Sequence, residues 1–339
     1  MKRVVVTGFG AITPIGNNAQ EYWENLVKGV SGAAPITLFD STNFKTKFAC
    51  EVKNFNPLDH FEKKEAKKMD RNTQLGIVAA REAVSHSRII EDNVDKDRVG
   101  VIWGSGIGGL ETFETEVLGW ANSNNIPRFN PFFIPKMIAD ITPGQISIEY
   151  GFHGPNYATV SACASSANAL IDAKMLLQLG KADIIVCGGS EAAVTASGMG
   201  GFNSLMALST RNDDYKTASR PFDKDRDGFV LGEGAGCIIL EEYEHALKRG
   251  ATIYAELSGG GLSADAYHMT APHPEGLGAF LVMKNCLDDA GLTPDEIDHI
   301  NMHGTSTPLG DIAESNAIAK LLGEHAYDIQ INSTKSMTG

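Results

Sequence analysis

The chain has 339 residues, of which 42% are hydrophobic and 21% are charged, and its formal net charge is −13 at pH 7. This length and apolar content predict a large core, organised as two domains or as one duplicated unit, and the acidic balance argues against a general nucleic-acid binder. The five scattered cysteines form no Cys-x-x-Cys pair, which argues against a disulfide framework or a zinc site. This cysteine usage favours a protein of the reducing cytoplasm. No apolar run approaches membrane-spanning length.

Apolar runs typical of buried strands alternate along the chain with segments of helical period. The predicted strands cover residues 3–7, 99–103, 184–187, 236–240, 253–257 and 297–302. The predicted helices cover residues 19–27, 73–86, 167–178, 242–249, 277–290 and 311–322. This alternation predicts an α/β architecture in which the strands are buried on both faces.

The first strand runs into Gly8-Phe9-Gly10, which predicts a glycine turn after the strand. Residues 254–263 repeat the pattern of a strand, a hydroxyl residue, a glycine turn and another hydroxyl residue. This faint repeat suggests a duplication whose second half begins near residue 251.

Three segments imitate ligand-binding motifs and are set aside. The turn at Gly8 has Thr13 where a dinucleotide-binding fingerprint needs its third glycine. The acidic run at 223–228 imitates a calcium loop but has Gly234 at the twelfth position instead of glutamate. The glycine-rich segment 104–109 lacks the Lys-Ser/Thr ending of a phosphate loop, so close backbone approach is the simpler explanation for it.

Cys163 is the strongest candidate for a nucleophile. It follows an apolar strand pattern, and the small residues around it lead into an amphipathic helix. A cysteine in the first turn of a helix lies near unpaired N–H groups and the positive end of the helix dipole, so the pKa of its thiol should fall. The small neighbours leave room for a bulky acyl group. The alternative is a buried cysteine that packs as a small hydrophobe.

His303 and Lys335 lie at the ends of two further short strands. His303 enters a small-residue loop that opens a helix at Asp311, and Lys335 follows a short apolar strand near the end of the chain. A cysteine, a histidine and a lysine presented at strand ends could converge in one pocket. Such a set suits acyl transfer through a thioester better than peptide hydrolysis.

The sequence resembles the elongating class of β-ketoacyl-acyl-carrier-protein synthases, and within it the synthase II branch of bacterial type II fatty-acid synthesis. The resemblance spans residues 3–339 and includes the stretch around Cys163. Its other motifs are VVVTG at 4–8, PFF at 131–133, ALSTRN at 207–212, SRPFD at 219–223, DGFVLGEG at 227–234, HGTST at 303–307 and STKS at 333–336. It implies a thiolase fold of duplicated five-layer α-β-α-β-α architecture, with residues 1–250 as the half that carries the cysteine and 251–339 as the start of a truncated second half.

The resemblance also implies a decarboxylating Claisen condensation between an acyl-enzyme and malonyl-acyl-carrier protein. Cys163 would carry the acyl group and supply one oxyanion-hole N–H, and His303 would stabilise the malonyl enolate. Lys335 would orient the catalytic histidines. The family motif continues past Gly339 into a second catalytic histidine, so an inactive truncated chain is one alternative. A thiolase-type or polyketide-like acyl-CoA condensing enzyme is another, and a non-catalytic chain-length partner is disfavoured because the cysteine is present.

Further positions are assigned by the same resemblance. The substrate-pocket positions are Ile107, Phe202, Thr305 and Thr307. Asn301 and Glu314 match positions that bind a structural monovalent cation in some members, and no cofactor is required.

Positive charge gathers at residues 63–71 of this acidic chain. A solvated helix face is the simplest explanation for such a run. Acyl carrier proteins are acidic, however, so complementary charge would steer their docking. We therefore expect a docking surface for acyl- and malonyl-carrying carrier protein, and the resemblance further implies a homodimer. The docking residues are Lys64, Lys67, Lys68, Arg128 and Arg211.

Overall fold

The computed structural model describes residues 1–339, which form two compact units, each discontinuous in sequence. Unit 1 comprises Met1–Asn25, Glu51–Gly198 and Glu233–Leu257. Unit 2 comprises Leu26–Cys50, Met199–Gly232 and Ser258–Gly339. None of the helices combines the length and the apolarity needed to cross a bilayer.

Unit 1 is built on a six-stranded sheet with the strand order β5-β4-β6-β7-β1-β8. Strand β4 pairs in parallel with β5 and with β6, whereas β7 runs antiparallel to both β6 and β1, and β8 runs antiparallel to β1. The strands are β1 (Val4–Ile12), β4 (Val99–Gly104), β5 (Asn156–Thr159), β6 (Ile184–Glu191), β7 (Gly234–Glu242) and β8 (Ala255–Glu256).

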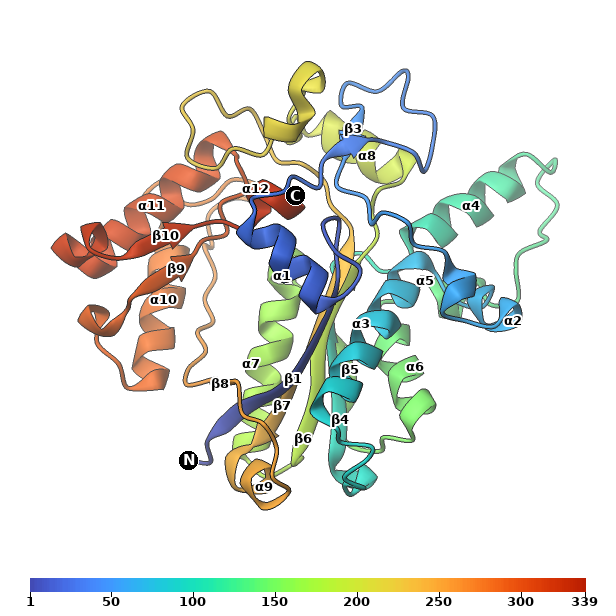
Figure 1. The fold of residues 1–339 in the computed structure, drawn as a ribbon. Helices are drawn as coiled ribbons and strands as arrows, with labels where there is room; N and C mark the ends of the chain where they lie inside the picture. The colour runs from blue at the N-terminus through green and yellow to red at the C-terminus, as the bar shows by residue number, and fades with distance from the viewer. The chain divides into compact units, whose positions relative to one another are not determined.

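Helices cover both faces of this sheet (Figure 1). Helices α3 (Arg71–Ser87) and α6 (Ile141–Tyr150) pack on one face, and α7 (Ser165–Gln178) packs on the other. Successive residues of β4 alternate between the two cores: Trp103 belongs to the core under α3, and Ile102 belongs to the core under α7. Burial on both faces explains why the central strands are continuous apolar runs. The other helices that lie in or enter unit 1 are α1 (Ala19–Val27), α2 (Lys63–Ala66), α4 (Leu110–Ala121), α5 (Phe133–Met137), α8 (Ala196–Ser204) and α9 (Tyr243–Lys248).

Unit 2 contains two small sheets and a pair of packed helices. The strands β9 (His299–Asn301) and β10 (Gln330–Asn332) are parallel, and β2 (Ala34–Pro35) and β3 (Phe48–Ala49) are antiparallel. A core that includes Met302, Ile318 and Leu322 fixes α11 against the β9 strand and α10. The helices of this unit are α10 (Leu277–Ala290), α11 (Pro308–Leu322) and α12 (Lys335–Thr338).

The predicted α/β class is confirmed, and α1 and α10 begin and end at the predicted residues. The predicted glycine turn after the first strand is wrong, because β1 continues through it to Ile12 with a bulge between Val6 and Gly8. Helix α3 lies directly on this part of the strand, and a Cβ at Gly10 would lie 2.7 Å from the backbone nitrogen of Ala83. The glycine therefore serves close helix–strand packing instead of chain reversal.

Candidate active site

Cys163 lies in a single 3₁₀ turn, Ala162–Ala164, between the end of β5 and the start of α7. Ser165 fixes this turn, because its hydroxyl accepts a hydrogen bond from the Ser161 N–H at 2.9 Å and donates one to the Ala162 carbonyl at 2.7 Å. The Thr159 hydroxyl donates to the Ser165 carbonyl at 2.8 Å, which joins the end of the strand to the first residue of the helix. The turn is thus held by side chains on both sides of Cys163.

The residue before Cys163 has a strained backbone. Ala162 has φ +50°, in the left-handed region that costs an alanine about 1–2 kcal/mol. Strain of this kind persists where the surrounding structure enforces it, and it is frequent at reactive residues. The turn leaves Cys163 exposed, whereas Cys50, Cys187 and Cys237 are buried and Cys286 is partly buried.

The first turn of α7 packs closely on the end of β4. A Cβ at Gly104 would lie 2.6 Å from the Cα of Ser166, so only a glycine lets the helix approach this far. The chain then continues as residues 104–109, here called the glycine loop, which carries Ile107. The Ile107 side chain is 45% exposed. The structure thus brings Ile107 and Cys163 into the same region of unit 1.

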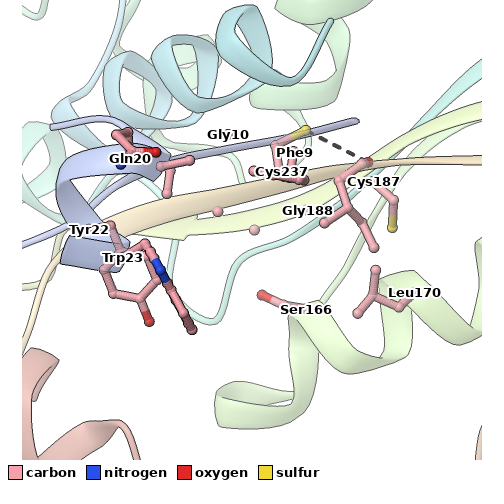
Figure 2. Close-up of a pocket in the computed structure, with 15 residues that line it drawn as sticks. Phe9, Gly10, Gln20, Tyr22, Trp23, Ser166, Leu170, Cys187, Gly188 and Cys237 are labelled. Carbon is pink, nitrogen blue, oxygen red and sulfur yellow. Dashed lines mark hydrogen bonds between the residues drawn. The ribbon is translucent and has the colours of Figure 1, made fainter. Parts of the chain in front are cut away.

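A groove of about 740 Å³ runs along α7, on the face of the six-stranded sheet that α7 covers (Figure 2). Its walls include Phe9, Trp23 and Leu170, and its lining is largely apolar. Cys187 and Cys237 also line it, but burial raises the pKa of both thiols well above the ordinary value. Cys163 is not among the lining residues, so the groove holds no reactive thiolate.

In unit 2, His303 follows β9 in a tightly constrained loop. Glu314, on α11, accepts hydrogen bonds from the backbone N–H groups of His303 at 2.6 Å and Gly304 at 2.9 Å. Gly304 has φ +41° and Ser306 has φ +65°, and the Ser306 hydroxyl accepts the Arg220 N–H at 3.1 Å. The sequence did not reveal this anchoring role of Glu314, because the contact depends on how α11 packs against the loop.

The surroundings of His303 favour its neutral form. Partial desolvation of the imidazole lowers its pKa, and the positive charge of Lys335 lowers it further, against the smaller opposing effects of Glu314 and Asp311. A neutral imidazole offers one N–H donor and one acceptor nitrogen. Lys335 is held in place at the start of α12, where its carbonyl accepts the Ser219 hydroxyl at 2.6 Å. The structure therefore brings His303, Lys335 and Glu314 together.

The remaining predicted pocket and cation residues also lie in unit 2. The hydroxyls of Thr305 and Thr307 are 3.1 Å apart just before α11. Phe202 packs edge-on against Phe229, with ring centroids 5.3 Å apart. The Asn301 side chain accepts the Thr334 N–H at 3.4 Å. Both oxygens of Glu314 already accept backbone N–H groups, and the chain has no cluster of three or more His, Cys, Asp or Glu side chains that could hold a metal ion.

The predicted docking residues are divided between the two units. Lys64, Lys67 and Lys68, here called the lysine patch, are exposed on and just after α2 in unit 1, and Arg128 is exposed in the same unit. Arg211 belongs to unit 2, where it forms an ion pair with Asp214 at 2.8 Å.

Comparisons with known proteins agree with this arrangement. Residues 1–246 match the β-ketoacyl synthase N-terminal domain, and residues 254–339 match the β-ketoacyl synthase C-terminal domain. A 3-oxoacyl-[acyl-carrier-protein] synthase 2 of Synechocystis sp. is 49% identical over 338 residues, which cover 100% of this chain and 81% of that protein. A synthase of the same name from Staphylococcus aureus is 50% identical over 339 residues, again 100% of this chain and 81% of that protein.

A solved structure shows the same fold. It contains a ketosynthase of a type II polyketide synthase in complex with its acyl-carrier protein, and it matches with a TM-score of 0.92 at 33% identity over 100% of this chain and 82% of that one. The thiolase fold expected from the sequence is thereby confirmed, and so is the resemblance on which it rested. The chain belongs to the β-ketoacyl synthase family.

Proposed function

We propose that this protein elongates fatty acids by decarboxylating condensation on acyl carrier protein. The observation that carries the proposal is the exposed Cys163 in its strained turn at the start of α7. Its thiolate attacks the thioester of an acyl-carrier protein, the acyl group moves to sulfur, and the carrier leaves as a thiol. Malonyl-carrier protein then loses CO₂, and the resulting carbanion attacks the acyl carbonyl. A C–C bond forms, the bond to the cysteine sulfur breaks, and β-ketoacyl-carrier protein leaves.

His303 and Lys335 act in the second half-reaction. The neutral imidazole donates a hydrogen bond to the malonyl thioester oxygen, where negative charge develops as CO₂ departs. The charge of Lys335 disfavours protonation of His303 and so preserves its neutral form. A single well-placed donor of this kind contributes about 3–4 kcal/mol to lowering the barrier. The proposed chemistry requires no cofactor.

Separate assays of the two half-reactions test this assignment. Cys163→Ala should abolish acyl transfer from an acyl-carrier protein to the enzyme, as measured by intact mass. His303→Ala should still acylate but should decarboxylate malonyl thioester about a hundred- to a thousandfold more slowly. Normal decarboxylation by His303→Ala would show that the histidine is structural.

The polyketide and acyl-CoA alternatives have less support than fatty-acid elongation. The relatives named as 3-oxoacyl-acyl-carrier-protein synthases are 49–50% identical to this chain, whereas the polyketide ketosynthase is 33% identical. An enzyme that uses CoA thioesters would acylate as fast from acyl-CoA as from acyl-carrier protein. A clear preference for the carrier-bound substrate supports the proposal.

We further propose that an acidic carrier protein docks through the lysine patch and Arg128 of unit 1. Arg211, the fifth predicted docking residue, lies in unit 2, where it pairs with Asp214. The patch is a concentration of exposed positive charge on a protein of net charge −13. Complementary charge steers the encounter and fixes the register of docking. The polyketide ketosynthase described above was solved with its carrier protein bound, which supports a surface of this kind.

A homodimer in the cytoplasm is also part of the proposal. The edge strand β5 has no neighbour on one side; it exposes Tyr157, and Val160 directly after it is also exposed. Unpaired edges with apolar side chains are normally covered in native proteins. Further large apolar side chains are exposed between residues 113 and 138: Phe113, Leu118, Trp120, Ile126, Phe129, Phe132, Ile134 and Ile138. Light scattering after size-exclusion chromatography should give twice the chain mass, and a monomer would contradict the proposal.

A structural monovalent cation at Asn301 and Glu314 is a final part of the proposal. Carboxylate and amide oxygens suit a hard cation. Thermal unfolding in KCl and NaCl should then occur at a higher temperature than in choline chloride at equal ionic strength. Identical melting temperatures would contradict the cation site.

A further inference from the structure

A single carboxylate holds the glycine loop next to Cys163. Glu191 lies at the end of β6, and its Oε2 accepts hydrogen bonds from the backbone N–H groups of Gly106 at 2.7 Å and Ile107 at 3.1 Å. Its Oε1 lies 3.4 Å from the Ser105 hydroxyl, and that hydroxyl in turn accepts the Gly108 N–H at 3.1 Å. The loop has glycine at four of its six positions, so its own sequence gives it little rigidity.

The loop that Glu191 holds lies directly against the nucleophile turn. A Cβ at Gly106 would lie 2.9 Å from Glu191 Oε2 and 3.4 Å from the carbonyl oxygen of Ala162, the residue before Cys163. The Ser105 N–H also donates to the carbonyl of Thr159, at 3.3 Å, in the strand that leads to the cysteine. An acyl group on the Cys163 sulfur therefore has this loop as a neighbouring wall, and the exposed Ile107 side chain projects from it.

Burial alone would disfavour a charge at this position. Desolvation raises the pKa of the Glu191 carboxyl, and the hydrogen bonds from Gly106, Ile107 and Gly108 oppose the rise because they stabilise the carboxylate. The geometry gives this partly buried carboxylate two direct backbone donors, both from the glycine loop and neither from its own strand. The β6 strand itself does not need it, because its ladder to β7 is complete up to the Glu191–Gly234 pair.

We propose that Glu191 is a positioning residue that fixes the glycine loop beside Cys163 and thereby determines how strongly the enzyme discriminates between acyl chains. The inference rests on the proposed acylation of Cys163. With the anchor in place, the backbone of Ile107 has one position and its side chain forms a defined wall. Without the anchor, the loop can change its conformation to accommodate acyl chains of different length. The enzyme then discriminates less between these chains.

Two measurements on the full-length enzyme test the proposal. Hydrogen exchange should show the Gly106 and Ile107 amides exchanging about tenfold or more faster in Glu191→Ala than in wild type, because their acceptor is gone. Rates of Cys163 acylation should then be compared for hexanoyl, decanoyl and tetradecanoyl pantetheine thioesters. The dependence of rate on chain length should flatten in Glu191→Ala and return in Glu191→Gln, whose amide oxygen can still accept from the loop.

Glu82→Ala provides a matched control. The Glu82 carboxylate also accepts two backbone N–H groups, from Ala11 at 2.8 Å and Ala19 at 2.9 Å, but it lies on α3 and anchors the β1–α1 connection instead of the glycine loop. This variant should change stability without changing the chain-length profile. If Glu191→Ala does not fold, Glu191→Asp withdraws the carboxylate by one methylene and should give the same flattening.

Three outcomes separate this inference from the proposed function. Unchanged exchange of Gly106 and Ile107 in the Glu191 variants would overturn the anchoring role. Faster exchange with an unchanged chain-length profile would overturn the role in selectivity. If wild type fails to acylate at Cys163 with any of the three thioesters, the proposed function itself is wrong.

Discussion

Glu314 is predicted to act on catalysis through His303, and the size of its effect follows from its two hydrogen bonds. It accepts the N–H groups of His303 at 2.6 Å and Gly304 at 2.9 Å. A hydrogen bond to a charged group contributes about 1.5–3 kcal/mol to the stability of the arrangement it holds. For each bond of Glu314 we take the lower end of this range, because the contact is only partly buried. Loss of both bonds in Glu314→Ala therefore removes roughly 3 kcal/mol from the positioning of His303. If the activation free energy of decarboxylation rises by this full amount, the reaction slows about a hundredfold.

The assay is malonyl-thioester decarboxylation, with Cys163 acylation measured in parallel. Glu314→Ala should slow the first reaction and leave the second nearly unchanged. Glu314→Gln keeps one acceptor oxygen but turns its NH₂ toward the other N–H, so we expect a loss of about tenfold. Ser315→Ala is the matched control on the same helix, because its hydroxyl donates only to the Asp311 carbonyl within α11.

A double-mutant cycle with His303→Ala decides whether the effect passes through the histidine. If Glu314 acts by positioning His303, then Glu314→Ala should cost little more once the imidazole is absent. A full hundredfold loss in the His303→Ala background would refute the reasoning and assign Glu314 a separate role.

Three further predictions concern the other residues of the site. Cys163 should react with iodoacetamide faster than Cys187 and Cys237, because burial raises the thiol pKa of those two; faster labelling of either of them in the folded protein, mapped by mass spectrometry, would contradict this. Lys335→Met should shift the acid limb of the decarboxylation pH profile to higher pH, because the charge of Lys335 contributes to lowering the pKa of His303 and its loss lets the imidazole protonate at higher pH; a limb that stays in place, or an unchanged His303 titration by NMR, would show that this charge is irrelevant. Replacement of the lysine patch by glutamates should raise KM for carrier-protein substrates and leave turnover of a small pantetheine thioester nearly unchanged. The difference in KM between wild type and variant should shrink as the salt concentration rises. Equal losses of activity with both substrates would mean that the segment supports the fold.

The amino-acid sequence by itself determined the features that depend on local pattern. The helices α1 and α10 follow from apolar periodicity, and the apolar runs at β4 and β6 follow from burial of each strand on both faces. The order of small residues after β5 predicted Cys163 in the first turn of a helix, and the structure has it in a 3₁₀ turn directly before α7. Short apolar segments predicted that His303 and Lys335 follow strands, and they come two and three residues after β9 and β10 end. These are properties of neighbouring residues, so a linear reading could find them.

Only the tertiary structure decided which carboxylates support the site. Glu191 and Glu314 each bond backbone N–H groups far away in the sequence or on a different element, and nothing in their immediate neighbours distinguishes them from exposed acids. The course of β1 through Gly10 was likewise decided by α3, whose backbone occupies the space that a side chain would need. A glycine permits both a turn and a close contact, and a carboxylate permits both solvation and anchoring. The choice depends on what packs against them, which the local sequence does not contain.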